Sequence, residues 1–385
     1  MKRLFMGILL ILCAFTGVQA QEDSAKFSVG GYVKYLQSIT FSGAPNSPTT
    51  TNLIHNRVNL GWRPNSHWEA VVEVRNRVFF GEEVKLTPNF ARQVDTYPGL
   101  MDLSVRWAEP NGVLVHSIAD RAYLRYTQAQ WEVTLGRQRI NWGRNLTWNP
   151  NDLFNTFNFL DFDYEERPGN DALRVRRYFG VASEADVAFA PDSALKNSIG
   201  AARMLFNVKG YDLQALAGYY RGDLALGLGW EGNLGSMGFR GEATWFEPLE
   251  PSPDTTGTLS ASLTLDYMTN DGWYLTLAGL YNQRGAQGGQ ANLGLAAALP
   301  SPKNLFPSEF AFIFAASKSI SPVLNLSVSG IYATDNQLTG IIPVVTYSIR
   351  ENWDLDLVGQ TFLGNYTGDY QHLVTAAFLR MKWSY

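Results

Sequence analysis

Residues 67–80 read HWEAVVEVRNRVFF, and the two faces of this stretch point to the fold class. One face is apolar with the single exception of Asn76: Trp68, Ala70, Val72, Val74, Val78 and Phe80. The other carries charge together with Val71 and Phe79: Glu69, Glu73, Arg75 and Arg77. Successive side chains of a strand point to opposite faces, so this alternation predicts a strand that is apolar on one side and charged on the other. A strand of a soluble β-sandwich could show the same pattern, so one strand does not distinguish a soluble sandwich from a membrane barrel.

The alternation recurs along the chain and predicts eighteen strands, with sixteen as the alternative because 172–197 is poorly patterned. The expected strands span 26–40, 51–63, 67–80, 113–127, 131–141, 172–181, 184–190, 198–208, 211–221, 224–232, 237–247, 258–269, 272–284, 309–318, 323–333, 339–350, 353–363 and 371–385. Every second connection is short, and the long ones fall between them. Bacterial barrels have this rhythm, with short periplasmic turns and long external loops. The sequence therefore predicts an all-β, transmembrane antiparallel β-barrel in the bacterial outer membrane.

The N-terminus is typical of an exported protein. A cationic start (residues 1–3), an apolar run (residues 4–18) and small residues before Gln21 predict a signal peptide over 1–20 and a mature barrel over 21–385. The only cysteine, Cys13, falls inside the expected signal, so disulfides and cysteine-held metals are not expected. Without Lys2 and Arg3, 29 of the 31 basic residues remain against 35 acidic ones. This balance gives no reason to expect a nucleic-acid partner.

Residues 131–178 interrupt the regular pattern. The stretch begins as a strand and then places Arg137 and Arg139 on the same parity as Trp131 and Leu135, where lipid would not readily accept a charge. Either Gly136 marks a bulge that turns the arginines inward, or the strand has left the membrane by that point. The long segment 142–171 is dense in aromatic and acidic residues. We expect it to fold over or into the lumen as a constriction loop.

Arginines and acids of this region are the candidate site. Arginine carries a fixed positive charge and a planar fork that binds carboxylate or phosphate in pairs. Acids facing such arginines across a constriction would orient charged or dipolar solutes. The alternative is that these groups pair simply to hold the loop against the wall. The pore-lining and constriction candidates are Arg121, Tyr123, Arg125, Arg137, Arg139, Arg144, Asp152, Asp161, Asp163, Arg174 and Arg176.

Other chemistry is sparse. Asp161, Asp163 and Glu165 could gather oxygens around a cation, but the rest of a calcium loop is absent. The four histidines are scattered and show no metal or triad spacing. We therefore expect no metal, no cofactor and no enzymatic activity. The final strand ends in Trp383 and Tyr385. A terminal aromatic after such alternation resembles the signal that the barrel insertion machinery of the outer membrane binds.

One family resemblance rests on about fifty residues. Residues 121–126 (RAYLRY), 133–143 (VTLGRQRINWG), 149–155 (NPNDLFN) and the later Asp171-Ala172 are similar to the alginate-export and related porin-like outer-membrane barrels. The resemblance implies a barrel that passes solutes across the outer membrane, in some members an anionic polysaccharide. It does not fix the solute of this chain.

These observations together predict a porin-like passive channel for hydrophilic, anionic or sugar-like solutes. The expected partners are outer-membrane lipid, the insertion machinery and a small hydrophilic solute. The alternative is a closed barrel with a structural, adhesive or lipid-handling role, its lumen filled by the loop. The two differ in whether about thirty loop residues leave a polar passage.

Overall fold

The computed structural model describes residues 26–42, 48–95, 99–156, 163, 169–180, 182–250, 256–285, 301–335, 337–365 and 368–385. The expected signal peptide lies outside these residues and remains a prediction. No helix in these ranges is long and apolar enough to span a membrane.

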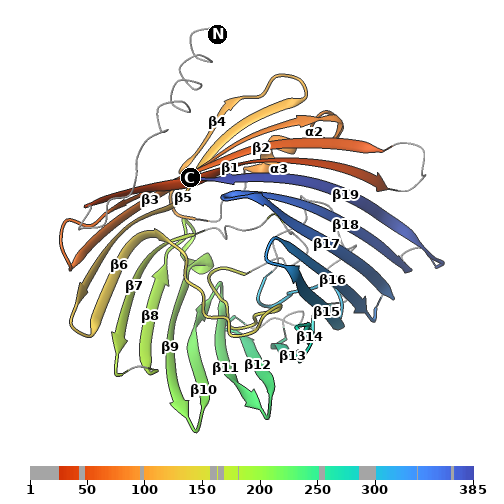
Figure 1. Cartoon of the computed structure of the whole chain (residues 1–385). Coiled ribbons are helices and arrows are strands. Elements are labelled where there is room, and N and C mark those ends of the chain that lie inside the picture. The colour runs from red at the N-terminus through yellow and green to blue at the C-terminus, as the bar shows by residue number, and fades with distance from the viewer. Residues whose placement is uncertain are drawn as a thin grey trace.

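The strands of the described residues form one antiparallel sheet that closes on itself (Figure 1). The barrel strands are β1 (Phe27–Ser42), β2 (Thr49–Trp62), β3 (Trp68–Gly81), β5 (Val113–Gln128), β6 (Trp131–Gln138), β7 (Asn170–Tyr178), β8 (Glu184–Ala190), β9 (Ile199–Val208), β10 (Tyr211–Tyr220), β11 (Asp223–Leu234), β12 (Met237–Pro248), β13 (Thr258–Met268), β14 (Tyr274–Asn282), β15 (Phe310–Ser321), β16 (Leu324–Ala333), β17 (Leu338–Arg350), β18 (Trp353–Asn365) and β19 (Tyr370–Ser384). The first strand, β1, pairs with both β2 and β19, which closes the ring. The predicted fold class and all eighteen strands are confirmed, with ends shifted by a few residues.

The segment between β3 and β5 has structure that the sequence did not predict. It contains two short helices, α2 (Glu82–Leu86) and α3 (Phe90–Val94), and a five-residue strand, β4 (Ser104–Ala108). β5 pairs with β6 over its second half, and β4 pairs with residues 115–118 of β5 where β6 has already ended. A short 3-10 turn, η1 (Leu195–Asn197), precedes β9. The small strand therefore extends the wall beside the point where the chain leaves β6.

The two faces of the wall match the predicted alternation. On β3, Trp68 and Val72 are 40% and 41% exposed on the outer surface. On the inner face, Glu69 and Arg75 form ion pairs with other strands. Leu226, Leu228, Phe312 and Phe314 repeat the exposed apolar pattern on β11 and β15. An apolar exterior around a charged interior is the arrangement of a barrel that sits in lipid.

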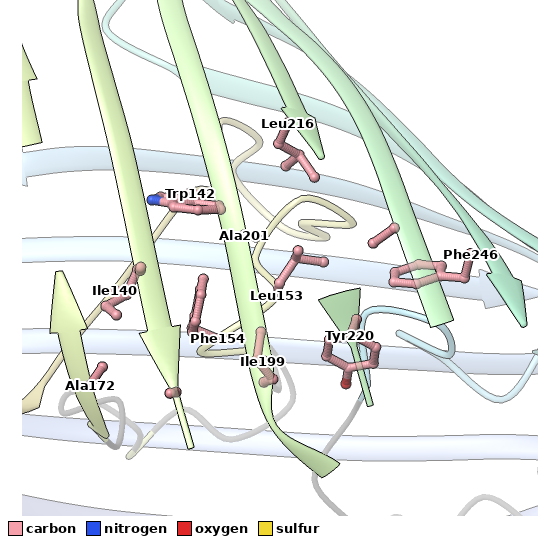
Figure 2. Packing of buried hydrophobic residues seen from close by; sticks show 13 residues of the cluster. Ile140, Trp142, Leu153, Phe154, Ala172, Ile199, Ala201, Leu216, Tyr220 and Phe246 are labelled. Carbon is pink, nitrogen blue, oxygen red and sulfur yellow. The ribbon is translucent and has the colours of Figure 1, made fainter. Parts of the chain in front are cut away.

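Residues 139–156, here called the inner loop, leave β6 and lie inside the barrel (Figure 1). Ile140, Trp142, Leu153 and Phe154 of the inner loop pack in one buried cluster against wall residues (Figure 2). The wall residues of that cluster are Ala172, Ala188, Ala190, Ile199, Ala201, Leu216, Tyr220, Ala225 and Phe246. Trp148 belongs to a second cluster with Leu305, Phe306 and inward residues of β14–β18. The predicted infolding is therefore confirmed for the described part of the loop.

Candidate functional site

A bulge in β5 sets which charges face the lumen. Glu73 of β3 pairs with Arg121, and the next residue of β3, Val74, pairs with Ala119, so Asp120 is an extra residue in β5. A bulge reverses the alternation of the residues that follow it. Asp120 and Arg121 are therefore both buried, and the inward parity changes from even to odd along β5. Arg121 and Arg125 lie on the lumenal parity that the sequence predicted.

Asp120 is the centre of a group that we call the closure cluster: Lys34, Arg57, Glu73, Arg75 and Asp120. Its carboxylate accepts hydrogen bonds of 2.7 Å from both Arg57 and Arg75. Arg57, only 1% exposed, also pairs with Glu73. A buried charge is tolerated when it is paired and hydrogen-bonded, which these groups achieve through their mutual contacts. The cluster lies across β1, β2, β3 and β5, next to the strand pair that closes the barrel.

A second group, the charged belt, follows the inner wall from β3 to β9. It consists of Glu69, Arg125, Glu132, Arg174, Arg176, Glu184, Asp186 and Arg203. Arg125 Nη1 lies 2.8 Å from Glu69 and its Nε lies 3.3 Å from Glu132, which also pairs with Arg176. Arg174 Nη2 lies 2.5 Å from Asp186, and Arg203 pairs with Glu184. Four arginines thus face four acids, and the belt presents both signs of charge to the lumen.

One carboxylate on the far wall accepts several hydrogen bonds from the inner loop. Glu242 of β12, 1% exposed, accepts hydrogen bonds from three backbone N–H groups of the inner loop. The donors are Arg144, Asn145 at 2.8 Å and Asn151 at 3.0 Å. Buried backbone donors need partners, and hydrogen bonds to an ionised group are among the stronger ones. Glu242 therefore supplies acceptors that no strand ladder could provide for this loop.

The opposite end of the 142–171 segment contacts the other side of the barrel. Asp163 Oδ1 lies 2.7 Å from Lys34 Nζ of β1 and 3.1 Å from Arg380 Nη1 of β19. In the order of the sheet, β12 lies across the ring from β1 and β19 (Figure 1). The 142–171 segment therefore contacts the wall on opposite sides of the ring, at Glu242 through residues 144–151 and at Lys34 and Arg380 through Asp163.

Gly136, near the end of β6, has a backbone conformation that requires glycine. Its φ is +115°, and a Cβ there would lie 2.3 Å from the Ala122 carbonyl oxygen, so only glycine fits. The following Arg137 is fully buried and donates to both Asp171 oxygens at 3.0 and 3.1 Å and to the carbonyl oxygen of Ala119. β6 keeps its register through Gln138, so Arg137 stays on the parity of Trp131 and Leu135, and the bulge lies in β5 rather than at Gly136. The burial of Arg137 favours the role of holding the loop.

The other predicted residues separate by exposure. Arg139 is exposed and makes no hydrogen bond or ion pair in the described part of the chain. Arg144 lies 3.4 Å from Glu231, and Asp152 is fully buried, accepting from the Trp142 backbone N–H at 3.3 Å. Tyr123 lies under the Arg125 guanidinium. Arg174 and Arg176 belong to the belt. Asp161 lies outside the described residues, and the pore-lining assignment as a whole remains a prediction.

Several site residues were missed by sequence analysis. Glu242, Asp120 and Asp186 hold the inner loop, the closure cluster and the belt, yet each is a single acid in an alternating strand. The one available signal was the inward parity of Asp186 and Glu242 in their strands. Among the residues described, no group of three or more His, Cys, Asp or Glu could hold a metal ion.

The C-terminal aromatics lie outside the lumen. Trp383 stacks on Trp353 with ring centroids 6.0 Å apart. Tyr385 crosses β1 and donates its hydroxyl to the Arg57 carbonyl oxygen of β2 at 2.9 Å. Gly31 makes room for this crossing, because a Cβ there would lie 2.9 Å from the Tyr385 hydroxyl and 2.0 Å from the Arg57 carbonyl. Tyr385 thus ties β19 to β2 across the closing strand, and its predicted part in membrane insertion remains untested.

The architecture is that of solved porins. A BenF-like porin from Pseudomonas fluorescens Pf-5 superposes with a TM-score of 0.58 at 11% identity, covering 93% of this chain and 98% of that one. OccAB4 of Acinetobacter baumannii superposes with 0.57 at 8% identity, covering 93% and 98%. OccK7 of Pseudomonas aeruginosa gives 0.55 at 9%, covering 94% and 99%. No family model and no curated protein matches the sequence. The likeness is therefore one of fold: this chain is a porin-type β-barrel.

Proposed function

We propose that this chain is a passive channel of the bacterial outer membrane for small hydrophilic solutes. The observation that carries the proposal is the inner loop, fixed at Glu242 on β12, together with Asp163 on β1 and β19. A segment held across the lumen narrows the passage without needing to move. The charged interior and apolar exterior support insertion in lipid, with the short turns on the periplasmic side.

The solute class follows from the lining. The charged belt offers paired carboxylates and guanidiniums, which can bind polar solutes but would repel apolar ones. Lys34, Arg57 and Arg75 are paired with Asp163, Glu73 and Asp120, so these charges hold the wall and the loop. The partly exposed guanidiniums of the charged belt support a solute with anionic or sugar-like character. The resemblance to alginate-export barrels remains a hypothesis about the solute, and the insertion machinery remains the expected assembly partner. We propose no enzymatic activity.

A closed barrel is the second candidate, and one observation favours it. Trp142, Trp148 and Leu153 of the inner loop are almost completely buried in the two apolar clusters, so part of the lumen is filled by protein. In this alternative the charged groups only hold the loop, and the barrel has a structural, adhesive or lipid-handling role. The two candidates share the fold and differ in whether ions cross.

Single-channel conductance separates them. The purified mature protein is placed in a planar bilayer, and the reversal potential is measured under a salt gradient. Stable openings support the channel, and a reversal potential shifted toward that of the anion supports anionic solutes. A folded, inserted barrel that passes no current would reject the channel and favour the closed barrel. A Glu242→Ala variant gives the internal check, because freeing the inner loop should raise the current in a channel that the loop narrows.

A further inference from the structure

Arg177 is a charged residue on the outer surface of the barrel. Its neighbours Arg174 and Arg176 face the lumen, where they pair with Asp186 and Glu132. Strand alternation therefore places Arg177 on the outside with Leu173 and Phe179, which are 46% and 47% exposed. The residue itself is exposed. It is thus a cation on the face that the strands otherwise give to apolar side chains.

Aromatic rings flank the Arg177 guanidinium, and none of the described residues supplies it with an acceptor. The guanidinium carbon lies 5.1 Å from the ring centroid of Trp131, its cross-strand partner on β6, and 5.1 Å from that of Phe179. In the described part of the chain Arg177 makes no hydrogen bond or ion pair. Two aromatic faces hold the planar group, and its five N–H donors remain available for a ligand.

Arg177 lies at the end of its strand, at the level where lipid headgroups would surround the barrel. Arg177 is one residue from the end of β7, and Trp131 is the first residue of β6, so both lie at the short-turn end of the barrel. Aromatic belts of transmembrane proteins lie at the membrane interface, and long basic side chains there keep their charge in the polar layer. The guanidinium therefore lies at the depth at which phosphates of the surrounding leaflet are found.

The same pairing recurs at this end of the barrel. Lys318 Nζ of β15 lies 5.5 Å from the ring centroid of Trp273, beside the start of β14. The guanidinium carbon of Arg350 at the end of β17 lies 5.1 Å from the ring centroid of Trp353, the first residue of β18. Neither cation has a hydrogen bond or ion pair to the residues that the structure describes. Three separate strand pairs thus present a cation on an aromatic ring at the same level.

We propose that Arg177, between Trp131 and Phe179, binds the phosphate of a phospholipid in the leaflet around the short-turn end. Arginine binds phosphate through two parallel hydrogen bonds, and the flanking rings fix the plane in which those donors lie. The acyl chains of the same lipid would cover the apolar surface next to the guanidinium. Lys318 and Arg350 form weaker sites of the same kind, because each has one aromatic ring rather than two. The inference rests on the proposed membrane location.

The test uses native mass spectrometry of the detergent-solubilised mature barrel. The probes are dioleoylphosphatidylglycerol and dioleoylglycerol, which has the same chains and no phosphate. We expect the wild-type barrel to retain the phospholipid and not the diacylglycerol. Arg177→Gln should weaken phospholipid binding about tenfold, as expected for losing a charge-assisted hydrogen-bonded pair. Changing Lys318 and Arg350 to Gln as well should remove most of the remaining bound lipid.

Matched controls identify the source of any effect. Arg176→Gln removes the guanidinium of the preceding residue, which faces the lumen, and should leave phospholipid binding unchanged. Equal retention of phospholipid by wild type and Arg177→Gln would overturn the proposal, as would displacement of the lipid by millimolar inorganic phosphate, which would indicate a free-anion site. Conductance of Arg177→Gln should match wild type. If the wild-type barrel conducts and Arg177→Gln keeps its lipid, the lipid site is rejected and the proposed channel stands. If the wild-type barrel passes no current, the proposed channel function is rejected.

Discussion

The inward faces of two parts of the barrel differ in chemistry. On β14–β17 the inward residues of the second cluster are apolar: Ala278, Leu280, Ala311, Ile313, Ile331, Ala333 and Leu338. These pack against Trp148, Leu305 and Phe306. On β1, β2 and β5 the closure cluster places Lys34, Arg57 and Asp120 at comparable burial, and Arg75 of β3 is 14% exposed. The apolar wall excludes water and supports the loop, whereas the charged wall must be satisfied by partners.

This difference indicates where a hydrophilic solute would pass. An apolar surface packed against tryptophan is stabilised by the exclusion of water and by close packing. The charged belt keeps several side chains partly exposed, such as Arg125 at 30% and Arg176 at 19%. A solute that needs hydrogen bonds would therefore follow the belt. Changes on each side should thus affect different measurements, and four variants test this division.

Glu242→Ala should have the largest effect, because the Glu242 carboxylate accepts hydrogen bonds from three buried backbone N–H groups of the inner loop. Removing its carboxylate leaves three buried N–H groups without acceptors, each costing about 1–3 kcal/mol. We expect a loss of roughly 3–9 kcal/mol in the free energy of unfolding, measured by urea titration of the refolded barrel, and a higher conductance. Glu242→Gln is the control. Its amide oxygen can still accept hydrogen bonds, so its stability and conductance should lie between those of wild type and Glu242→Ala. Unchanged stability and current in Glu242→Ala would show that the loop is held elsewhere.

Arg137→Ala comes next and tests the buried pair with Asp171. Breaking a buried ion pair by removing one partner typically costs about 3–5 kcal/mol, because the remaining charge stays buried. We expect that loss in unfolding free energy and little change in ion selectivity, since the fully buried side chain cannot reach a passing solute. The double variant Arg137→Met with Asp171→Leu should recover part of the stability. A selectivity change with intact stability would instead assign Arg137 to the pore.

Strand positions could be predicted because they depend on local alternation. The pattern of residues 67–80 reappears as β3 with its charged face inward, and the short turns alternate with long loops as expected. β4 was not predicted, because the alternation over its five residues is too short to be distinguished from a loop. The bulge at Asp120 was not predicted either, because a bulge depends on the pairing of two strands and leaves no signal in the local sequence pattern. Local patterns thus locate strands, and pairing decides the details.

The candidate site was predictable only in part for the same reason. The lumenal parity of Arg125 follows from its strand, and Arg125, Arg174 and Arg176 each pair with an acid of a neighbouring strand. The contact of Glu242 with backbone groups about ninety residues earlier in the chain has no sequence signal. Arg137 and Arg139, two residues apart, differ completely in burial because Arg137 is still paired with β5 and β7 as part of β6, whereas Arg139 follows the end of that strand.

Arg139→Ala should have a smaller effect than Arg137→Ala. It should change ion selectivity and leave stability nearly unchanged. Arg139 is exposed and lacks a hydrogen bond or ion pair among the described residues, so its loss should change stability by no more than about 0.5 kcal/mol. If its charge faces the solute path, the reversal potential under a salt gradient should move toward that of the cation. Arg139→Lys keeps the charge and should behave as wild type. Identical reversal potentials in all three proteins would remove Arg139 from the selective surface.

Ser104→Ala should have the smallest effect and tests the short segment that leads into β4. The Ser104 hydroxyl donates to Asp102 at 2.6 Å and its backbone N–H donates at 2.9 Å. These bonds hold the pKa of the Asp102 carboxyl below its ordinary value. A lowered pKa contributes stability above the ordinary pKa of the group and loses it as the pH falls through the folded value. Ser104→Ala removes the hydroxyl bond and keeps the backbone bond, so the Asp102 pKa should rise only part of the way. Carboxyl carbon chemical shifts followed against pH measure this change, and an unchanged midpoint would mean that the backbone bond alone sets it. Because Asp102 lies near the surface, folding and conductance should stay as in wild type, in contrast to the variants of the buried groups.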